Sequence, residues 1–140
     1  MPVEKVSPEL DRIVPPNPKI EILAEGFGGD QGPAEGPLWW KEGGYLLFSD
    51  IHNNQRMKWS PQDGVSVFLE PTNRANGLTR DLQGRLIACE HETRRVTRLE
   101  LDGSLTVLAN TYKGIQLNRP NDVVVKSDGS IYFTDPWTAR

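Results

Sequence analysis

Three stretches of the chain repeat one pattern: Gly44-Tyr45-Leu46-Leu47-Phe48-Ser49-Asp50, Gly84-Arg85-Leu86-Ile87-Ala88-Cys89-Glu90 and Gly129-Ser130-Ile131-Tyr132-Phe133-Thr134-Asp135. Each stretch consists of a turn glycine, a short apolar run, a small residue and an acidic residue. The three glycines lie 40 and then 45 residues apart. A repeat at a spacing of this size sets the architecture of the whole chain, because each copy is one structural unit.

The residues around these stretches complete a unit of four short strands. The dipeptides Asp63-Gly64 and Asp102-Gly103 lie between alternating apolar runs and therefore predict tight hairpins. One more apolar run precedes each turn glycine: Leu38-Trp39-Trp40, Leu78-Thr79-Arg80 and Val123-Val124-Val125. Four strands at a period of about 40–45 residues are typical of a β-propeller blade. The sequence therefore predicts an all-β propeller, in preference to a sandwich or irregular barrel with evenly spaced strands.

The repeat also predicts the domain layout. Residues 1–32 are rich in proline and are expected to form an irregular leader, in which Ile20-Glu21-Ile22-Leu23 is a candidate extra strand. An incomplete propeller then occupies residues 33–140, with blades at about 33–72, 73–110 and 111–140, the last of them truncated. Closed propellers have about 4–8 blades, and open sheet edges present unpaired backbone groups. We therefore expect a natural truncation or a fragment, with self-association through the open blade edges.

Composition excludes several classes of function. The net charge of −3 argues against nucleic-acid binding, which requires clustered basic residues. Cys89 is the only cysteine, so neither an internal disulfide nor a zinc–thiolate cluster can form. No apolar run reaches the length of a signal peptide or of a membrane helix. We expect a cytoplasmic protein without a membrane partner, in which Cys89 is a buried small apolar residue.

Chemistry is expected where the chain leads into the first strand of each blade, because these strands line the central channel. The three lead-in loops are Ala34-Glu35-Gly36-Pro37, Arg74-Ala75-Asn76-Gly77 and Arg119-Pro120-Asn121-Asp122. Glu35, Asn76 and Asn121 occupy nearly equivalent positions in them. Carboxylate and amide oxygens suit Ca²⁺, and they suit Zn²⁺ less well because no histidine or cysteine is expected to converge with them.

The same residues have simpler interpretations. Asparagine and glycine are common turn formers, which is sufficient to explain Asn76 taken alone. In the repeat register we favour Glu35 and Asn121 as metal ligands, and Asn76 as a substrate-binding residue. His91 follows a second strand and is expected to rim the same face, as a candidate substrate contact or proton shuttle. An ordinary surface hydrogen bond is its simpler interpretation.

Several motifs together resemble the gluconolactonase branch of the senescence-marker-protein (regucalcin) family. They are Glu35-Gly36-Pro37, Asn76-Gly77-Leu78, Asn118-Arg119-Pro120-Asn121-Asp122, and the second and third repeat stretches quoted above. The resemblance runs from about Gly32 to Trp137 and implies a six-bladed propeller of about twice this length. It implies one divalent metal in the channel, usually Ca²⁺ and sometimes Zn²⁺. Glu35 corresponds to a metal ligand, and Asn121 lies at the metal or the substrate.

The resemblance further implies a hydrolase that opens a small-molecule sugar lactone. The remaining ligands of the family, a second asparagine and an aspartate that is the usual general base, come from later blades and have no counterpart up to Arg140. Whether the 140-residue chain is active is therefore open. Two alternatives remain: a non-catalytic propeller fragment that acts as a binding or assembly module, and a phosphotriesterase-like propeller hydrolase with the same metal geometry.

Overall fold

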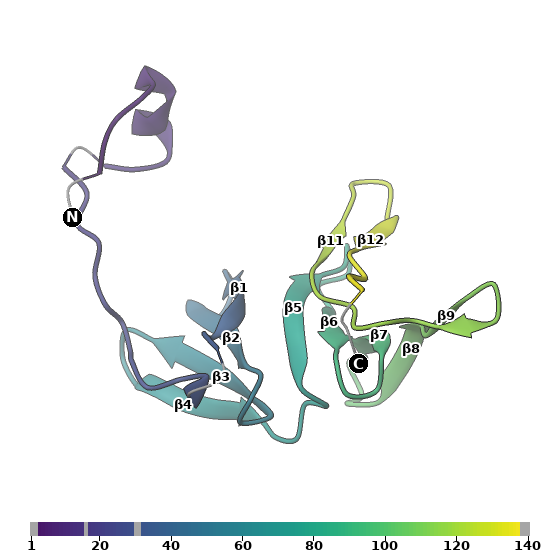
Figure 1. The fold of residues 1–140 in the computed structure, drawn as a ribbon. Coiled ribbons are helices and arrows are strands. Elements are labelled where there is room, and N and C mark those ends of the chain that lie inside the picture. The colour runs from purple at the N-terminus through teal and green to yellow at the C-terminus, as the bar shows by residue number, and fades with distance from the viewer. Residues whose placement is uncertain (1–2, 16, 30–31, 138–140) are drawn as a thin grey trace.

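The chain folds into antiparallel sheets with almost no helix (Figure 1). The computed structural model describes residues 3–15, 17–29 and 32–137. The short 3-10 helix η1 (Pro8–Arg12) is capped by Ser7, whose hydroxyl accepts a hydrogen bond from the backbone N–H of Glu9. Across the described ranges, no helix has both the length and the apolar character that a membrane crossing requires. The predicted all-β class is confirmed.

The first sheet has the strand order of a propeller blade. Four consecutive antiparallel strands lie side by side in it: β1 (Glu35–Trp40), β2 (Tyr45–Asp50), β3 (Gln55–Ser60) and β4 (Gly64–Leu69). The hairpin predicted at Asp63-Gly64 joins β3 to β4, and Gly64 adopts a φ of 68°, which glycine tolerates without strain. A register shift in β1 between Glu35 and Leu38 separates the lead-in loop from the regular strand.

The second sheet repeats the first. Its strands are β5 (Ala75–Arg80), β6 (Leu86–Glu90), β7 (Arg95–Leu99) and β8 (Leu105–Ala109), in the order β5-β6-β7-β8. The register shift recurs at the equivalent place, between Ala75 and Leu78. A shift that recurs at the same point of both blades is a property of the repeating unit, and it gives the start of each inner strand a separate conformation.

The third unit contains two pairs of short strands. A hairpin of β9 (Thr111–Tyr112) and β10 (Ile115–Gln116) follows the second sheet, and β11 (Val123–Val125) then pairs with β12 (Ile131–Phe133). In Figure 1 the inner strands β1, β5 and β11 follow one another across the middle of the molecule. Both β1 and β11 contact β5. The structure is therefore that of consecutive propeller blades, as the repeat predicts.

The apolar core lies between blades. On β6, Leu86 and Ala88 pack against Leu47 of the first blade, whereas Ile87 and Cys89 pack on the opposite side. Side chains of a strand alternate between the two faces of a sheet, so a blade covered on both sides has a strand that is buried throughout. This explains why every residue of β6 is buried, and it confirms that Cys89 is a buried apolar residue.

The last residues of the N-terminal segment, Phe27 and Gly28, contact the first blade. The ring of Phe27 packs edge-on against Phe48 at 5.0 Å, and the N–H of Gly28 donates to the carboxylate of Asp50. The hypothesis of an extra strand at residues 20–23 is wrong: these residues belong to none of the sheets in the described structure, and Ile22 is 77% exposed. An apolar alternation forms a strand only beside a sheet edge with which it can pair.

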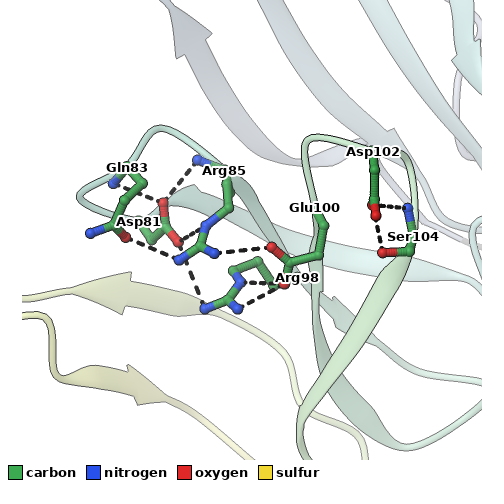
Figure 2. A network of polar contacts seen from close by, with 7 residues as sticks. All are labelled: Asp81, Gln83, Arg85, Arg98, Glu100, Asp102 and Ser104. Carbon is green, nitrogen blue, oxygen red and sulfur yellow. Dashed lines mark hydrogen bonds and ion pairs between the residues drawn. The ribbon is translucent and has the colours of Figure 1, made fainter.

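A network of charged side chains ties the β5–β6 turn to the β7–β8 turn (Figure 2). Asp81 Oδ1 accepts from the backbone N–H groups of Gln83 and Arg85, at 3.0 and 2.8 Å. Arg85 Nε donates to Asp81 Oδ2 at 2.7 Å, and its Nη1 donates to Glu100 at 3.0 Å. Glu100 also pairs with Arg98. Because the four charged side chains are only partly exposed, the network fixes both turns at the outer end of the blade.

This network predicts a pH-dependent stability. Burial alone would raise the pKa of Asp81, but its hydrogen bonds to Arg85 and Gln83 and the charge of Arg85 together hold the pKa below its usual range. Such a group stabilises the fold above the unfolded-state pKa of about 3.9 and loses that contribution as the pH falls through the folded-state value. We expect Asp81→Asn to lower the free energy of unfolding by about 1–2 kcal/mol at pH 7. Urea titrations should show that the difference in stability between the wild type and Asp81→Asn shrinks below pH 4. A difference at pH 3 equal to that at pH 7 would contradict the prediction.

Candidate functional site: the cavity at the lead-in loops

The three lead-in loops stack against one another, with glycine at each contact. The N–H of Gly77 donates to the carbonyl oxygen of Asn121 at 2.8 Å. A Cβ on Gly36 would lie 2.2 Å from the carbonyl oxygen of Asn76, and a Cβ on Gly77 would lie 2.5 Å from that of Asn121. Both distances are far below van der Waals contact. Glycine after Glu35 and after Asn76 therefore allows each loop to approach the next one at backbone distance.

A cavity of about 360 Å³ opens at these loops. All four side chains predicted from the sequence to form the site line it: Glu35, Asn76, His91 and Asn121. They come from three successive units of the chain. The structure thus brings the sequence candidates together in one place.

The lining follows the register of the repeat. Each lead-in loop contributes two residues to the lining: the one equivalent to Glu35 and the one two positions before it. Each unit also contributes the residue that directly follows the acid at the end of its repeat stretch. These nine residues are Pro33, Glu35, Ile51, Arg74, Asn76, His91, Arg119, Asn121 and Pro136, and Gly32 and His52 complete the lining. Equivalent positions of successive blades therefore converge on one space, which is what a propeller axis requires.

Glu35 is held in place by Asn76. Asn76 Nδ2 donates to Glu35 Oε2 at 2.5 Å, and this contact joins residues 41 positions apart. Asn76 is only 3% exposed, and its carbonyl oxygen accepts from the hydroxyl of Ser49 at 2.6 Å. Because Asn76 uses its amide nitrogen on Glu35, it fixes the orientation of that carboxylate towards the cavity.

The loop that carries Asn121 is fixed by Asp135. The two oxygens of Asp135 accept from the backbone N–H groups of Asn118 and Arg119, both at 2.8 Å, and Asn118 Nδ2 also donates to Asp135 at 3.3 Å. The N–H of Asn121 donates to the carbonyl oxygen of Thr134 at 2.9 Å. The acid that ends the third repeat stretch is therefore a loop anchor beside the cavity.

The acids of the other two repeat stretches are also anchors. Asp50 is 2% exposed and binds the N–H of Gly28 and the side chain of Asn53. Glu90 is 3% exposed and accepts from four side chains, those of Asn73, Thr93, Arg95 and Thr97. Each of these acids ends the second strand of its blade, and its oxygens are used by the protein itself. They are not free to act on a ligand.

Two histidines, His52 and His91, line the cavity, which corrects the expectation that no histidine converges with the loop oxygens. Burial lowers the pKa of His91, the charge of Arg119 lowers it further, and Glu35 opposes both. His91 is therefore neutral at pH 7. Its Nε2 has no hydrogen-bond partner among the described residues. A neutral imidazole with such a ring nitrogen can bind a hydroxyl group or accept a proton.

Arg74 and Arg119 are the lining residues that sequence reasoning missed. Both lie two positions before an asparagine of the site, so the repeat register contained the signal. The N–H of Arg74 donates to Asn54 Oδ1 at 2.7 Å, which fixes the loop at a residue whose φ is 52°. Both arginine side chains are exposed, so solvent screens their charge, although the charge of Arg119 still lowers the pKa of His91.

The types of oxygen atom in the cavity are those that a hard divalent cation prefers as ligands. Glu35 offers a carboxylate, and Asn76 and Asn121 offer amide oxygens, which are ligands of Ca²⁺. The described residues contain no group of three or more His, Cys, Asp and Glu side chains placed to hold a metal ion. Calcium takes 6–8 oxygen ligands, so these residues would supply only part of its coordination.

Because its blades converge on a polar cavity, the chain is classed as a β-propeller protein whose candidate site lies where the blades meet. The sequence profile described as SMP-30/Gluconolactonase/LRE-like region matches residues 33–140. The chain belongs to this family. It is 34% identical to a gluconolactonase of Zymomonas mobilis subsp. mobilis over 148 residues, which cover 96% of this chain and 40% of that protein.

Solved structures agree with this assignment. A structural-genomics X-ray structure assigned as a gluconolactonase matches with a TM-score of 0.80 and 35% identity, over 94% of this chain and 44% of the other. A gluconolactonase from Xanthomonas campestris matches with a TM-score of 0.68 and 43% identity, over 74% and 35%. Virginiamycin B lyase from Staphylococcus aureus, at 15% identity and a TM-score of 0.57, shares the fold. The chain thus spans less than half the length of each of these relatives.

Proposed function

We propose that this chain forms part of the active site of a metal-dependent hydrolase that opens a sugar lactone to its hydroxy acid. The observation that carries the proposal is the convergence of Glu35, Asn76, His91 and Asn121 on one cavity. The family and the gluconolactonase relatives support the substrate class. Each residue then has a part that follows from its chemistry.

Glu35 and Asn121 are proposed to hold the metal, with Ca²⁺ as the first candidate and Zn²⁺ as the second. The metal, when bound, would polarise the lactone carbonyl and stabilise charge on its oxygen. Asn76 keeps the carboxylate of Glu35 oriented through the 2.5 Å hydrogen bond. A carboxylate fixed in this way loses less conformational entropy when it binds a cation.

Asn76, Asn121 and His91 are proposed to bind the substrate. Asn121 presents an amide that can donate to or accept from sugar hydroxyl groups. His91 contributes a neutral imidazole, whose Nε2 can accept a hydrogen bond. Arg74 and Arg119, which also line the cavity, are proposed to pair with the carboxylate that appears when the ring opens. Glu35 is the only carboxylate among the described residues that line the cavity, and we assign it to the metal and not to proton abstraction from water.

The test is hydrolysis of glucono-1,5-lactone by the 140-residue chain, followed with a pH indicator in CaCl₂ and in EDTA. We expect calcium-dependent hydrolysis above the spontaneous rate, because a bound metal polarises the lactone carbonyl without a general base from this chain, and we expect Glu35→Gln to abolish this increase by removing a charged ligand. Glu92→Gln is the matched control, since Glu92 is exposed, lies outside the cavity lining and follows His91 in the sequence. Its rate should equal that of the wild type.

Three results would count against the proposal. Hydrolysis that is unchanged in EDTA and in Glu35→Gln would contradict metal dependence. Hydrolysis of a phosphotriester in place of the lactone would identify the alternative class, a phosphotriesterase-like propeller hydrolase. A folded chain that binds calcium and hydrolyses neither substrate would show that these residues bind but do not catalyse.

A further inference from the structure

A second cavity, of about 150 Å³, lies between the first two blades and shares no lining residue with the cavity at the lead-in loops. Part of its wall is aliphatic and is formed by Leu69, Leu99 and Leu105. Another part is polar and includes Arg56 and Glu90. A space with an apolar wall and a charged wall is suited to a small amphipathic ligand.

Arg56 is the unusual residue of this cavity. It lies on β3 and is only 4% exposed, yet its Nε has no hydrogen-bond partner among the described residues. A buried donor without a partner is costly, and for a charged group the cost is greater. Burial lowers the pKa of Arg56 to about 10, which still leaves the guanidinium protonated at neutral pH. The wall of the cavity therefore includes a residue with a positive charge and an Nε donor whose hydrogen-bonding capacity is unused.

Glu90 does not use that capacity. Its Oε1 accepts from Thr97 at 2.8 Å, and its Oε2 accepts from Asn73, Thr93 and Arg95, the last an ion pair at 2.7 Å. Arg95 thus compensates the charge of Glu90. The guanidinium groups of Arg56 and Arg95 and the carboxylate of Glu90 together carry a charge of plus one. This charge matches a ligand with a single negative charge.

We propose that the cavity between the first two blades binds a small monocarboxylate with a short aliphatic chain. The carboxylate accepts from Arg56, in a charge-assisted hydrogen bond, and the chain packs against the leucines. Such a ligand contacts both blades at once and stabilises their packing, because it binds the folded state and not the unfolded one. The proposal does not depend on lactone hydrolysis or on a metal.

Butyrate is the probe, titrated calorimetrically into the 140-residue chain in EDTA. We expect saturable binding at one site, and binding of the uncharged analogue butyramide that is about tenfold weaker or more, the effect of losing a hydrogen bond between charged groups. Arg56→Gln should weaken butyrate binding by a similar factor. Butyrate, and not butyramide, should also raise the melting temperature of the wild type.

A second pair of variants keeps the test decisive if Arg56→Gln fails to fold. Leu105→Trp should fill the cavity from β8 and leaves Arg56 itself unchanged. Leu101→Trp is its matched control, because Leu101 is 89% exposed and lies outside the lining. Binding lost in the first variant and kept in the second supports the proposal. Three results would overturn it: no saturable binding to the folded wild type, equal affinity in both tryptophan variants, or binding that Arg119→Ala abolishes and Leu105→Trp does not.

Discussion

Replacing Gly77 by alanine is expected to lower the free energy of unfolding by about 3 kcal/mol or more, the upper range for overpacking. The new Cβ would lie 2.5 Å from the carbonyl oxygen of Asn121 and 2.6 Å from the Cα of Asp122. Both are backbone atoms, so neither can move aside without moving the third lead-in loop. The hydrogen bond from the N–H of Gly77 to Asn121 would be lost with the contact. Urea titration followed by circular dichroism measures the loss.

Gly103→Ala is the control for this prediction. Gly103 has a φ of 85°, and an added Cβ would have no atom of the described residues within 4 Å, so alanine there costs only the left-handed backbone, roughly 1–2 kcal/mol. Gly77 has no positive φ, so its cost comes from the contact alone. If Gly77→Ala is no more destabilising than Gly103→Ala, the loops are not stacked at backbone distance. The proposed site would then lose its geometric basis.

Glu90→Ala is expected to lower the free energy of unfolding by about 3–5 kcal/mol, the cost of breaking a buried ion pair. The carboxylate is 3% exposed and accepts from four side chains, of which Arg95 is an ion-pair partner. Its charge also favours the protonated form of buried Arg56. Removing it leaves both guanidinium groups without their counter-charge, in a region packed between two blades.

The neighbouring variant Glu92→Ala measures the background. Glu92 is exposed, and changes at such positions alter stability by about 0.5 kcal/mol at most. Glu90→Gln keeps one acceptor oxygen but removes the charge, and should therefore lie between the two. A Glu90→Ala variant as stable as Glu92→Ala would show that the four hydrogen bonds are not formed in solution.

Much of the fold was predictable because the same strand and turn signals recur in each copy of the repeat. The turn glycines, the Asp-Gly hairpins and the alternating runs fix the strands of the first two blades. Leu86 to Glu90 is buried throughout because blades cover it on both sides, and its alternation is hidden in a continuous apolar run. The segment at residues 20–23 has the alternation of a strand but pairs with no sheet edge of the described structure, which a local pattern does not reveal.

The sequence predicted which residues form the candidate site, but it did not predict the hydrogen bonds between them. Equivalent lead-in loops pointed to Glu35, Asn76 and Asn121, and the structure places all three on one cavity. The hydrogen bond from Asn76 to Glu35 joins two blades, so no local pattern contains it. Arg74 and Arg119 were missed because arginine is common in exposed loops, and both side chains are indeed exposed beside the cavity. The burial of the acids Asp50 and Glu90 depends on tertiary contacts that the local sequence does not show.

Calcium titration by isothermal calorimetry tests the central claim most directly, namely that Glu35 holds a divalent cation at the axis. The samples are the wild-type 140-residue chain, Glu35→Gln and the control Glu92→Gln, each checked for folding by circular dichroism. We predict saturable one-site binding in the wild type and the control, and binding about 100-fold weaker or more in Glu35→Gln, because calcium affinity follows the charge of its ligands. Absence of binding in a folded wild-type chain, or equal affinity in all three proteins, would contradict the claim.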